Sequence, residues 1–225
     1  MTDRPILFSG PMVRALLDDR KTQTRRILKP QPYEYNGRWW IVDRHSGDCH
    51  LDLWARGDVG CRPIHPGDRL WVRETWAPLT SLTHNDPGPQ AIIDGGFYRA
   101  DGGTVDGEVS RWKPSIFMPR HASRLTLIVT DVRVERLQDI SEADAKAEGL
   151  QTHSDGDADD NGRARIYEYF RGSDDLEWER DPVDAYLSLW DAINGDGAAH
   201  ANLWVAAYTF TVIKQNIDEI EKVAA

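Results

Sequence analysis

The chain has 225 residues, enough to bury a hydrophobic core, and it carries 27 Lys and Arg against 37 Asp and Glu, a formal net charge of -10. This excess of negative charge opposes nonspecific attraction to a phosphate backbone and excludes a general role in packaging nucleic acid. There are only two cysteines, the N-terminus lacks the apolar run of a signal peptide, and charge interrupts every apolar stretch, so we expect a cytoplasmic protein outside the membrane.

The first predicted element is a short helix that leads into a cationic cluster. Ser9 and Pro11 are typical of a helix start, and Val13, Leu16 and Leu17 form an apolar stripe on one face. The cluster that follows reads Arg20-Lys21-Thr22-Gln23-Thr24-Arg25-Arg26. Lys21 and Thr24 face the same side only if the chain turns between them, because an extended strand sends residues three apart to opposite faces.

An amine beside a hydroxyl is suited to acyl transfer. A threonine hydroxyl becomes a nucleophile when a base takes its proton, and a lysine is such a base only when burial or nearby cations lower its pKa. Arg25 and Arg26 are placed to supply those cations. Two other interpretations remain open, namely a solvated basic edge or an anion clamp without chemistry.

Two strands and a helix are predicted in the middle of the chain. Residues 69–73 follow a Gly-Asp turn and alternate as a half-buried strand. The alternation of residues 125–129 resumes one residue out of phase at Val132, which indicates a bulge near Thr130 and a bent strand. Ser141 and Asp144 then resemble a capping box for a helix that ends at Gly149, which places Glu148 on its last turn.

The last predicted elements are a helix from Asp181-Pro182 to Asn194-Gly195 and a strand over 204–212. Three stretches, 31–62, 79–111 and 151–180, are rich in Gly, Pro and Asp and predict long loops inserted into one domain that spans residues 1–225. The acidic segment 154–162 is predicted to be a mobile surface loop.

A second candidate site lies at the end of the 69–73 strand. Trp71, Arg73, Glu74 and Trp76 combine aromatic faces with a cation and a carboxylate, which suits stacking on and hydrogen bonding to a planar heterocycle, and Arg120 is placed to add to them. The alternative is that the tryptophans belong to the core and the charges to the surface.

A zinc site is a weaker hypothesis. His45, Cys49, Cys61 and His65 have the ligand types and paired spacings of a structural zinc site, but two scattered cysteines are more often ordinary thiols. We therefore predict no metal and no cofactor.

Many ordered motifs give the chain a resemblance to the ASCH domain family, and especially to its longer phage and prophage members. The motifs are Gly10-Pro11-Met12-Val13, Arg20 to Arg26, Pro66 to Trp76, Trp112 to Arg120, Ala122-Ser123-Arg124, Val132 with Glu135-Arg136-Leu137, and Ile140 to Gly149. The resemblance implies an α+β fold built on a PUA-like small β-barrel with flanking helices.

The same resemblance implies an activity. Small bacterial members of the family hydrolyse the amide of N4-acylated cytidines with a lysine and a threonine from Lys-Thr-x-Thr and a glutamate after the central strands, positions that match Lys21, Thr24 and Glu148. The chain departs from the longer relatives at Phe117, His121 and Leu203.

We therefore expect a metal-independent amidohydrolase for a small nucleoside. In this mechanism Thr24 attacks, Lys21 takes its proton and Glu148 orients and protonates, while Arg26 or backbone amides stabilise the oxyanion. For Glu148 alone, the competing interpretation is a solvent-facing helix residue. The alternative function is a module that binds RNA or DNA and reads a modified or unpaired base without cleaving it.

Overall fold

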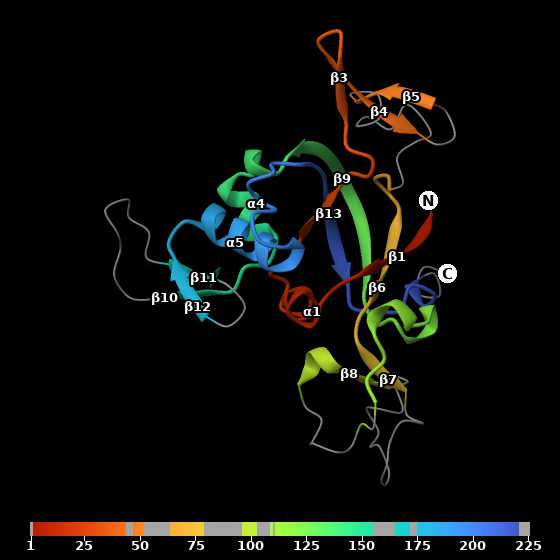
Figure 1. Cartoon of the computed structure of the whole chain (residues 1–225). Helices are drawn as coiled ribbons and strands as arrows, with labels where there is room; N and C mark the ends of the chain where they lie inside the picture. Colours follow the sequence, from red (N-terminus) through yellow and green to blue (C-terminus); the bar gives the residue numbers. More distant parts are fainter. Residues whose placement is uncertain are drawn as a thin grey trace. The chain divides into compact units, whose positions relative to one another are not determined.

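The computed structural model describes residues 2–43, 47–51, 64–78, 96–102, 109, 111–154, 165–171 and 175–220. The chain forms two compact units, each assembled from separate segments (Figure 1). Unit 1 contains residues 1–19, 67–129 and 210–225, and unit 2 contains residues 20–66 and 130–209.

The fold is α+β, with many strands and few helices. The largest sheet has five strands in the order β1-β6-β9-β13-β2, and three smaller sheets pair β10-β11-β12, β3-β4-β5 and β7-β8. All of these sheets are open, so no closed barrel occurs among the residues that the structure describes. No described helix has the length and apolar character needed to span a membrane.

Unit 1 holds β1 (Asp3–Leu7), α1 (Gly10–Leu17), β6 (Arg69–Arg73) and the first residues of β9 (Thr126–Arg136). Strands β1 and β6 are parallel, and β6 is antiparallel to β9. The unit also holds β7 (Trp76–Pro78), β8 (Gly96–Tyr98) and the single turns η2 (Arg99–Asp101), η3 (Ser115–Phe117) and η4 (Arg120–Ala122). Trp76, Tyr98, Met118 and Ala122 form a small buried cluster under these turns.

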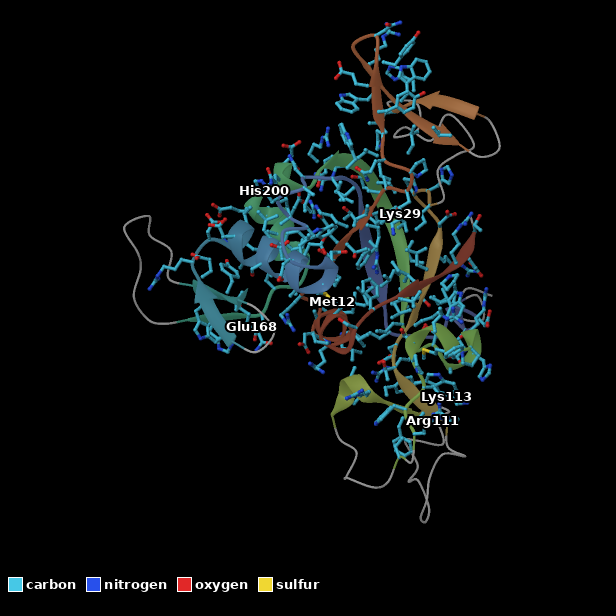
Figure 2. All side chains as sticks on the ribbon, viewed as in Figure 1. Met12, Lys29, Arg111, Lys113, Glu168 and His200 are labelled. Atoms are coloured by element: carbon cyan, nitrogen blue, oxygen red, sulfur yellow. The ribbon has the colours of Figure 1, made fainter. Side chains whose placement is uncertain are left out.

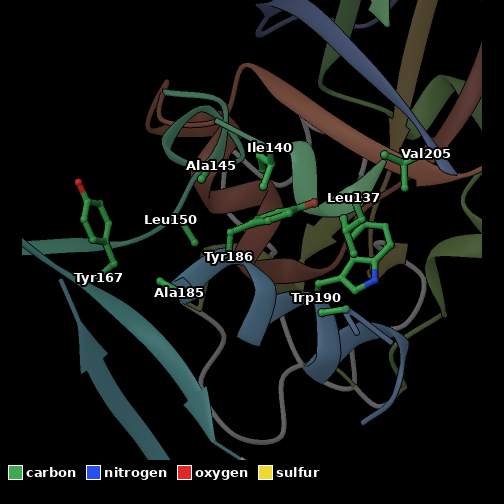
Figure 3. Packing of buried hydrophobic residues seen from close by; sticks show 10 residues of the cluster. Leu137, Ile140, Ala145, Leu150, Tyr167, Ala185, Tyr186, Trp190 and Val205 are labelled. Atoms are coloured by element: carbon green, nitrogen blue, oxygen red, sulfur yellow. The ribbon is translucent and has the colours of Figure 1, made fainter. Parts of the chain in front are cut away.

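Unit 2 holds β2 (Gln23–Ile27), the rest of β9, η5 (Leu137–Asp139), α4 (Glu142–Ala147), α5 (Pro182–Asn194) and most of β13 (Trp204–Ile213). Strand β2 pairs antiparallel with β13. The apolar face of α5 covers the main core of the unit (Figure 3). The core residues are Leu137, Ile140, Ala145, Leu150, Tyr167, Ala185, Tyr186, Trp190, Ala199 and Val205.

The elements with local start and stop signals are confirmed. Ser141 caps α4 by accepting a hydrogen bond from the Asp144 amide at 3.2 Å, and Asp181 caps α5 by accepting one from the Val183 amide at 2.8 Å. Gly149 follows α4 with a φ of 90°, a left-handed conformation that favours glycine. Along β9, two successive exposed residues, Thr130 and Asp131, mark the predicted change of phase.

Two expectations about local structure are wrong. Strand β6 is buried on both faces instead of one, since its first four residues, which alternate between the faces, are all buried; within the sheet it lies between β1 and β9. All three expected loops contain strands: β3 (Tyr33–Tyr35), β4 (Arg38–Asp43) and β5 (Gly47–His50) lie in the first, β8 in the second, and β10 (Thr152–Ser154), β11 (Arg165–Arg171) and β12 (Asp175–Glu179) in the third. Cross-strand pairing stabilises these short segments, several of which are rich in aromatic and β-branched residues despite the Gly, Pro and Asp around them.

Other expectations lie outside the described residues or are not decided. Residues 79–95 of the second loop and 155–162 of the acidic segment are not described. The single domain of residues 1–225 stays a prediction beside the two compact units.

Removal of the α5 cap tests this account of unit 2. Asp181→Ala leaves the Val183 amide without its partner, so we expect the free energy of unfolding to fall by about 1 kcal/mol in urea denaturation. Asp196→Ala, a change at an exposed turn position, is the control and is expected to stay within about 0.5 kcal/mol. An equal effect of the two substitutions would contradict the capping role.

Candidate functional site

The cationic cluster enters unit 2 as an extended chain. Lys21 forms an isolated antiparallel bridge with Glu148, the Thr22 amide donates to the Ala147 carbonyl at 2.8 Å, and β2 begins at Gln23. The backbone therefore brings Lys21 against the end of α4 before any side chain is considered.

Lys21 and Glu148 form a buried ion pair. Lys21 Nζ donates to Glu148 Oε2 at 2.7 Å and to the Glu148 backbone carbonyl at 2.8 Å. Lys21 is 1% exposed and Glu148 is 3% exposed. The competing interpretation of Glu148 as a solvent-facing residue is therefore wrong, because the bridge to Lys21 turns it into the interior. Both side chains are covered in this structure, so a substrate reaches Nζ only where that cover opens.

Arg25 occupies the other oxygen of the same carboxylate. Its Nη1 donates to Glu148 Oε1 at 3.1 Å, and its Nε and Nη2 donate to Glu135 Oε1 at 2.9 and 2.6 Å. Asp144 lies 3.3 Å from Arg25 Nη2. The guanidinium thus faces three carboxylates from β9, α4 and the residue after α4.

Two further side chains complete this network. Gln23 Nε2 donates to Asp144 Oδ1 at 2.8 Å, and Arg133 Nη2 lies 3.0 Å from the same oxygen. Because Lys21, Gln23 and Arg25 all contact carboxylates of this cluster, they share one side of the extended chain, as alternate residues do. We call Lys21, Gln23, Arg25, Arg133, Glu135, Asp144 and Glu148 the ion-pair network.

Tyr186 of α5 belongs to the main core of unit 2 (Figure 3) and also contacts this network. Arg25 lies over its ring, with the guanidinium carbon 5.9 Å from the ring centre. Burial, together with the nearby Glu148 charge and a hydrogen bond to Glu148, raises the pKa of Tyr186 well above its ordinary value. The hydroxyl therefore keeps its proton and donates it to the carboxylate.

Lys21 loses its proton more readily than an ordinary lysine does, because its pKa is lowered. Burial lowers the pKa of Lys21, the Glu148 carboxylate opposes this effect, and Arg26 and Arg25 lower the pKa further. Burial also acts to lower the pKa of Arg25, but Glu148 and Glu135 outweigh it and raise the value. Arg25 therefore remains a cation while Lys21 becomes easier to deprotonate.

Thr24 does not join Lys21. The predicted mechanism needs a turn between them, and this expectation is wrong because the segment is extended and Thr24 pairs with Tyr208 across β2 and β13. Thr24 is buried, but by alternation its side chain lies on the face opposite Lys21, Gln23 and Arg25. Arg26 shares that opposite face and is exposed.

The predicted base-binding residues lie in unit 1. Arg73 stacks on Trp71, with its guanidinium carbon 4.9 Å from the ring centre, and its Nε donates to the Met118 carbonyl at 2.9 Å. Trp71 and Trp76 are both buried. Lys113, labelled in Figure 2, lies over the Trp76 ring at 5.7 Å.

The charges among these residues already have partners. Glu74 is buried and accepts from Arg124 Nε and Nη2 at 2.9 and 3.1 Å, and burial raises the pKa of Glu74 despite that partner. Arg120 donates to Asp3 at 2.5 Å and to Asp218 at 2.9 and 2.6 Å. The buried tryptophans fit the alternative assignment to the core.

The zinc hypothesis falls mostly outside the described residues. His45 and Cys61 are not described, nor is the Cys49 side chain. Among the described residues, no group of His, Cys, Asp or Glu is arranged to hold a metal ion.

Comparison of the chain with protein-family models, with curated proteins and with solved structures gave no match. The resemblance to the ASCH family therefore stays a prediction from the motifs in the sequence.

Five members of the site were not expected from the sequence: Gln23, Tyr186, Glu135, Asp144 and Arg133. Asp144 was recognised only as part of a capping box, and Tyr186 lies in a helix that was predicted without a site residue. A usable signal existed for Glu135, because Arg133 and Glu135 are alternate charged residues on a largely apolar strand and share one face.

The ion-pair network predicts unequal costs for removing its two central partners. Glu148→Gln leaves both Lys21 and Arg25 without their shared carboxylate, so we expect the free energy of unfolding to fall by about 3–5 kcal/mol. Lys21→Met leaves Glu148 paired with Arg25 and is expected to cost less. Urea denaturation measures both.

Glu142→Gln in helix α4 is the matched control, because Glu142 forms a half-exposed ion pair with Lys146 at 3.6 Å. We expect a loss of no more than about 0.5 kcal/mol there, because exposed pairs one helical turn apart contribute little. A larger cost for Lys21→Met than for Glu148→Gln would contradict the shared role of Glu148.

Proposed function

We propose that this protein is an amidohydrolase that needs no metal ion and removes the acyl group from the N4 amine of cytidine-type nucleosides. The observation that carries the proposal is the buried contact of 2.7 Å between Lys21 and Glu148, with Arg25 on the other carboxylate oxygen. A buried amine with a lowered pKa beside a carboxylate is an arrangement suited to moving protons.

The extended geometry changes one role in the predicted mechanism. Because Thr24 faces away from Lys21, we assign the nucleophile to a water molecule. Neutral Lys21 takes a proton from this water as its oxygen adds to the amide carbonyl carbon. Lys21 hands this proton to Glu148 across their 2.7 Å contact, and Glu148 delivers it to N4 as the C–N bond breaks, which leaves a carboxylic acid and the free cytosine amine.

The family relationship is part of the same proposal. The motifs that resemble ASCH proteins support a PUA-like origin for the strands of the largest sheet, and the Lys-Thr-x-Thr lysine and the later glutamate are the residues in contact. The substrate class comes from this resemblance, and the proton-transfer pair from the geometry.

Turnover of N4-acetylcytidine without added metal tests the proposal. We expect chromatography to show cytidine release, unaffected by a chelator, that falls about 10²–10⁴-fold in Lys21→Met and Glu148→Gln proteins that retain a folding transition. Glu142→Gln is the control that keeps activity. No release from substrates with several different acyl groups would contradict the proposal.

A Thr24→Val protein in the same assay tests whether water or Thr24 is the nucleophile. The substitution removes the hydroxyl with little change in volume, and we expect most of the activity to remain. Loss of release in a folded Thr24→Val protein would return the nucleophile to Thr24.

The second candidate function, binding to unpaired bases, is favoured by one outward face in unit 2. The register pairs Tyr33 with Trp40, Tyr35 with Arg38 and Trp40 with His50, so these five side chains share one face of the β3-β4-β5 sheet. Tyr35 is 62% exposed and Tyr33 is 37% exposed. Exposed aromatic rings beside a cation are typical of surfaces on which single-stranded bases stack.

Fluorescence anisotropy with short single-stranded oligonucleotides tests this candidate. If bases stack here, Tyr35→Ala weakens binding by about 1–3 kcal/mol, while Trp178→Ala, a change of an exposed aromatic residue on another sheet, has no effect. Binding that survives Lys21→Met, with no turnover of free nucleosides, would favour this function over hydrolysis.

A further inference from the structure

The Glu148 carboxylate is divided between two cations of different chemistry. Its Oε2 accepts from Lys21 Nζ at 2.7 Å, and its Oε1 accepts from Arg25 Nη1 at 3.1 Å. Lysine changes its protonation state readily when it is buried, whereas a guanidinium keeps its charge in proteins. Of the two cations that share Glu148, only Lys21 is therefore able to give up its proton.

Arg25 is held in place by further contacts besides the one to Glu148. Glu135 Oε1 accepts two hydrogen bonds from it, at 2.9 and 2.6 Å, and Asp144 lies 3.3 Å away. The Arg25 side chain is fully covered, and Gln23 Oε1 accepts from its Nη1 at 3.3 Å. This number of fixed contacts leaves the guanidinium one orientation, with Nη1 directed at Glu148.

A permanent counter-charge on Glu148 changes what Lys21 can do. If Lys21 were the sole partner of Glu148, its deprotonation would leave a buried, uncompensated carboxylate, at a cost that keeps the proton on the amine. With Arg25 bound to the other oxygen, Glu148 remains paired when Lys21 becomes neutral. The positive charge of Arg25 also repels a proton on Lys21.

Charged and titratable groups approach this pair from every element packed against it. Strand β2 contributes Arg25 and Arg26, α5 contributes Tyr186, α4 contributes Asp144, and β9 contributes Glu135 and Arg133. Tyr186 stays protonated, and Arg133 lies 3.0 Å from Asp144 and 3.7 Å from Glu135. Among these described residues, Arg25 alone joins Glu148 to both of the other carboxylates, Glu135 and Asp144, through ion pairs.

We propose that Arg25 is a positioning residue that holds Glu148 through Oε1 and so allows Lys21 to alternate between its charged and neutral forms. This inference rests on the proposed function, because it explains how Lys21 acts as the base. It assigns to Arg25 a part in proton transfer without contact to the substrate.

Titration of the Lys21 side chain by NMR, with labelled lysine, tests the proposal without any substrate. The Lys21 signal is assigned by its absence from Lys21→Met. In Arg25→Gln, Glu148 pairs with Lys21 alone, so we expect Lys21 to titrate at higher pH than in the unaltered protein. In Arg133→Gln, which keeps the Arg25 contact with Glu148, we expect a smaller shift. An unchanged or lowered Lys21 titration in Arg25→Gln would overturn the proposal.

A second pair of proteins covers the case in which Arg25→Gln fails to fold. The double variant Arg25→Gln with Glu135→Gln removes one charge of each sign, and Glu135→Gln alone is its matched reference. We expect Lys21 to titrate at higher pH in the double variant than in Glu135→Gln. The same or a lower value would overturn the proposal.

The pH profile of the reaction separates positioning from a structural role. A raised Lys21 pKa moves the rising limb of kcat/KM to higher pH, so an Arg25→Gln protein loses about tenfold or more at neutral pH and recovers part of the loss at alkaline pH. A loss that is uniform across pH would mark a structural role. If no N4-acylcytidine is hydrolysed by the unaltered protein, the proposed function fails, while the NMR comparison still tests Arg25.

Discussion

The Glu148 carboxylate is the group on which the organisation of unit 2 depends. It follows α4, it bridges to Lys21 two residues before β2, and it accepts from this lysine, from Arg25 of β2 and from Tyr186 of α5. A buried carboxylate is costly unless each oxygen has a partner, and here the partners are cations or a protonated hydroxyl. The positions of α4, α5 and β2 are therefore coupled through one side chain.

The same interaction explains why polar residues occupy the interior of this unit. Lys21, Arg25 and Glu148 are all buried, next to a core that consists of aliphatic and aromatic side chains. Such a network adds less to stability than apolar packing of equal volume, but removal of one member is expensive. This asymmetry is expected where a charged pair serves chemistry, and the lowered pKa of Lys21 is consistent with that use.

The sequence predicted elements where local signals decide the structure. Caps at Ser141 and Asp181 begin helices through contacts two or three residues away, so the pattern alone identifies them. Strands that depend on distant partners were harder. Strand β6 was expected to be half-buried because its sequence does not reveal that the fold covers its second face, and β3 to β5 were expected to be loop because the Gly, Pro and Asp around them concealed short segments that pair with one another.

The candidate site shows the same contrast between features set by local signals and features set by distant partners. Lys21 and Glu148 were paired through a family resemblance, since residues separated by 127 positions give no local signal of contact. The turn to Thr24 was wrong because pairing with β13 holds β2 extended, a constraint that arises about 180 residues further along the chain. Arg25 was recognised as a cation near the amine, but its bond to Glu148 depends on the tertiary fold.

The most direct test of this account is the pKa of the Lys21 amine in the unaltered protein, measured by NMR titration of the labelled side chain. The account predicts a value below that of an ordinary lysine, because burial and the neighbouring arginines outweigh the attraction of Glu148. A value at or above the ordinary one would show that Glu148 keeps the proton on Lys21, and would contradict the proposed role of Lys21 as a base.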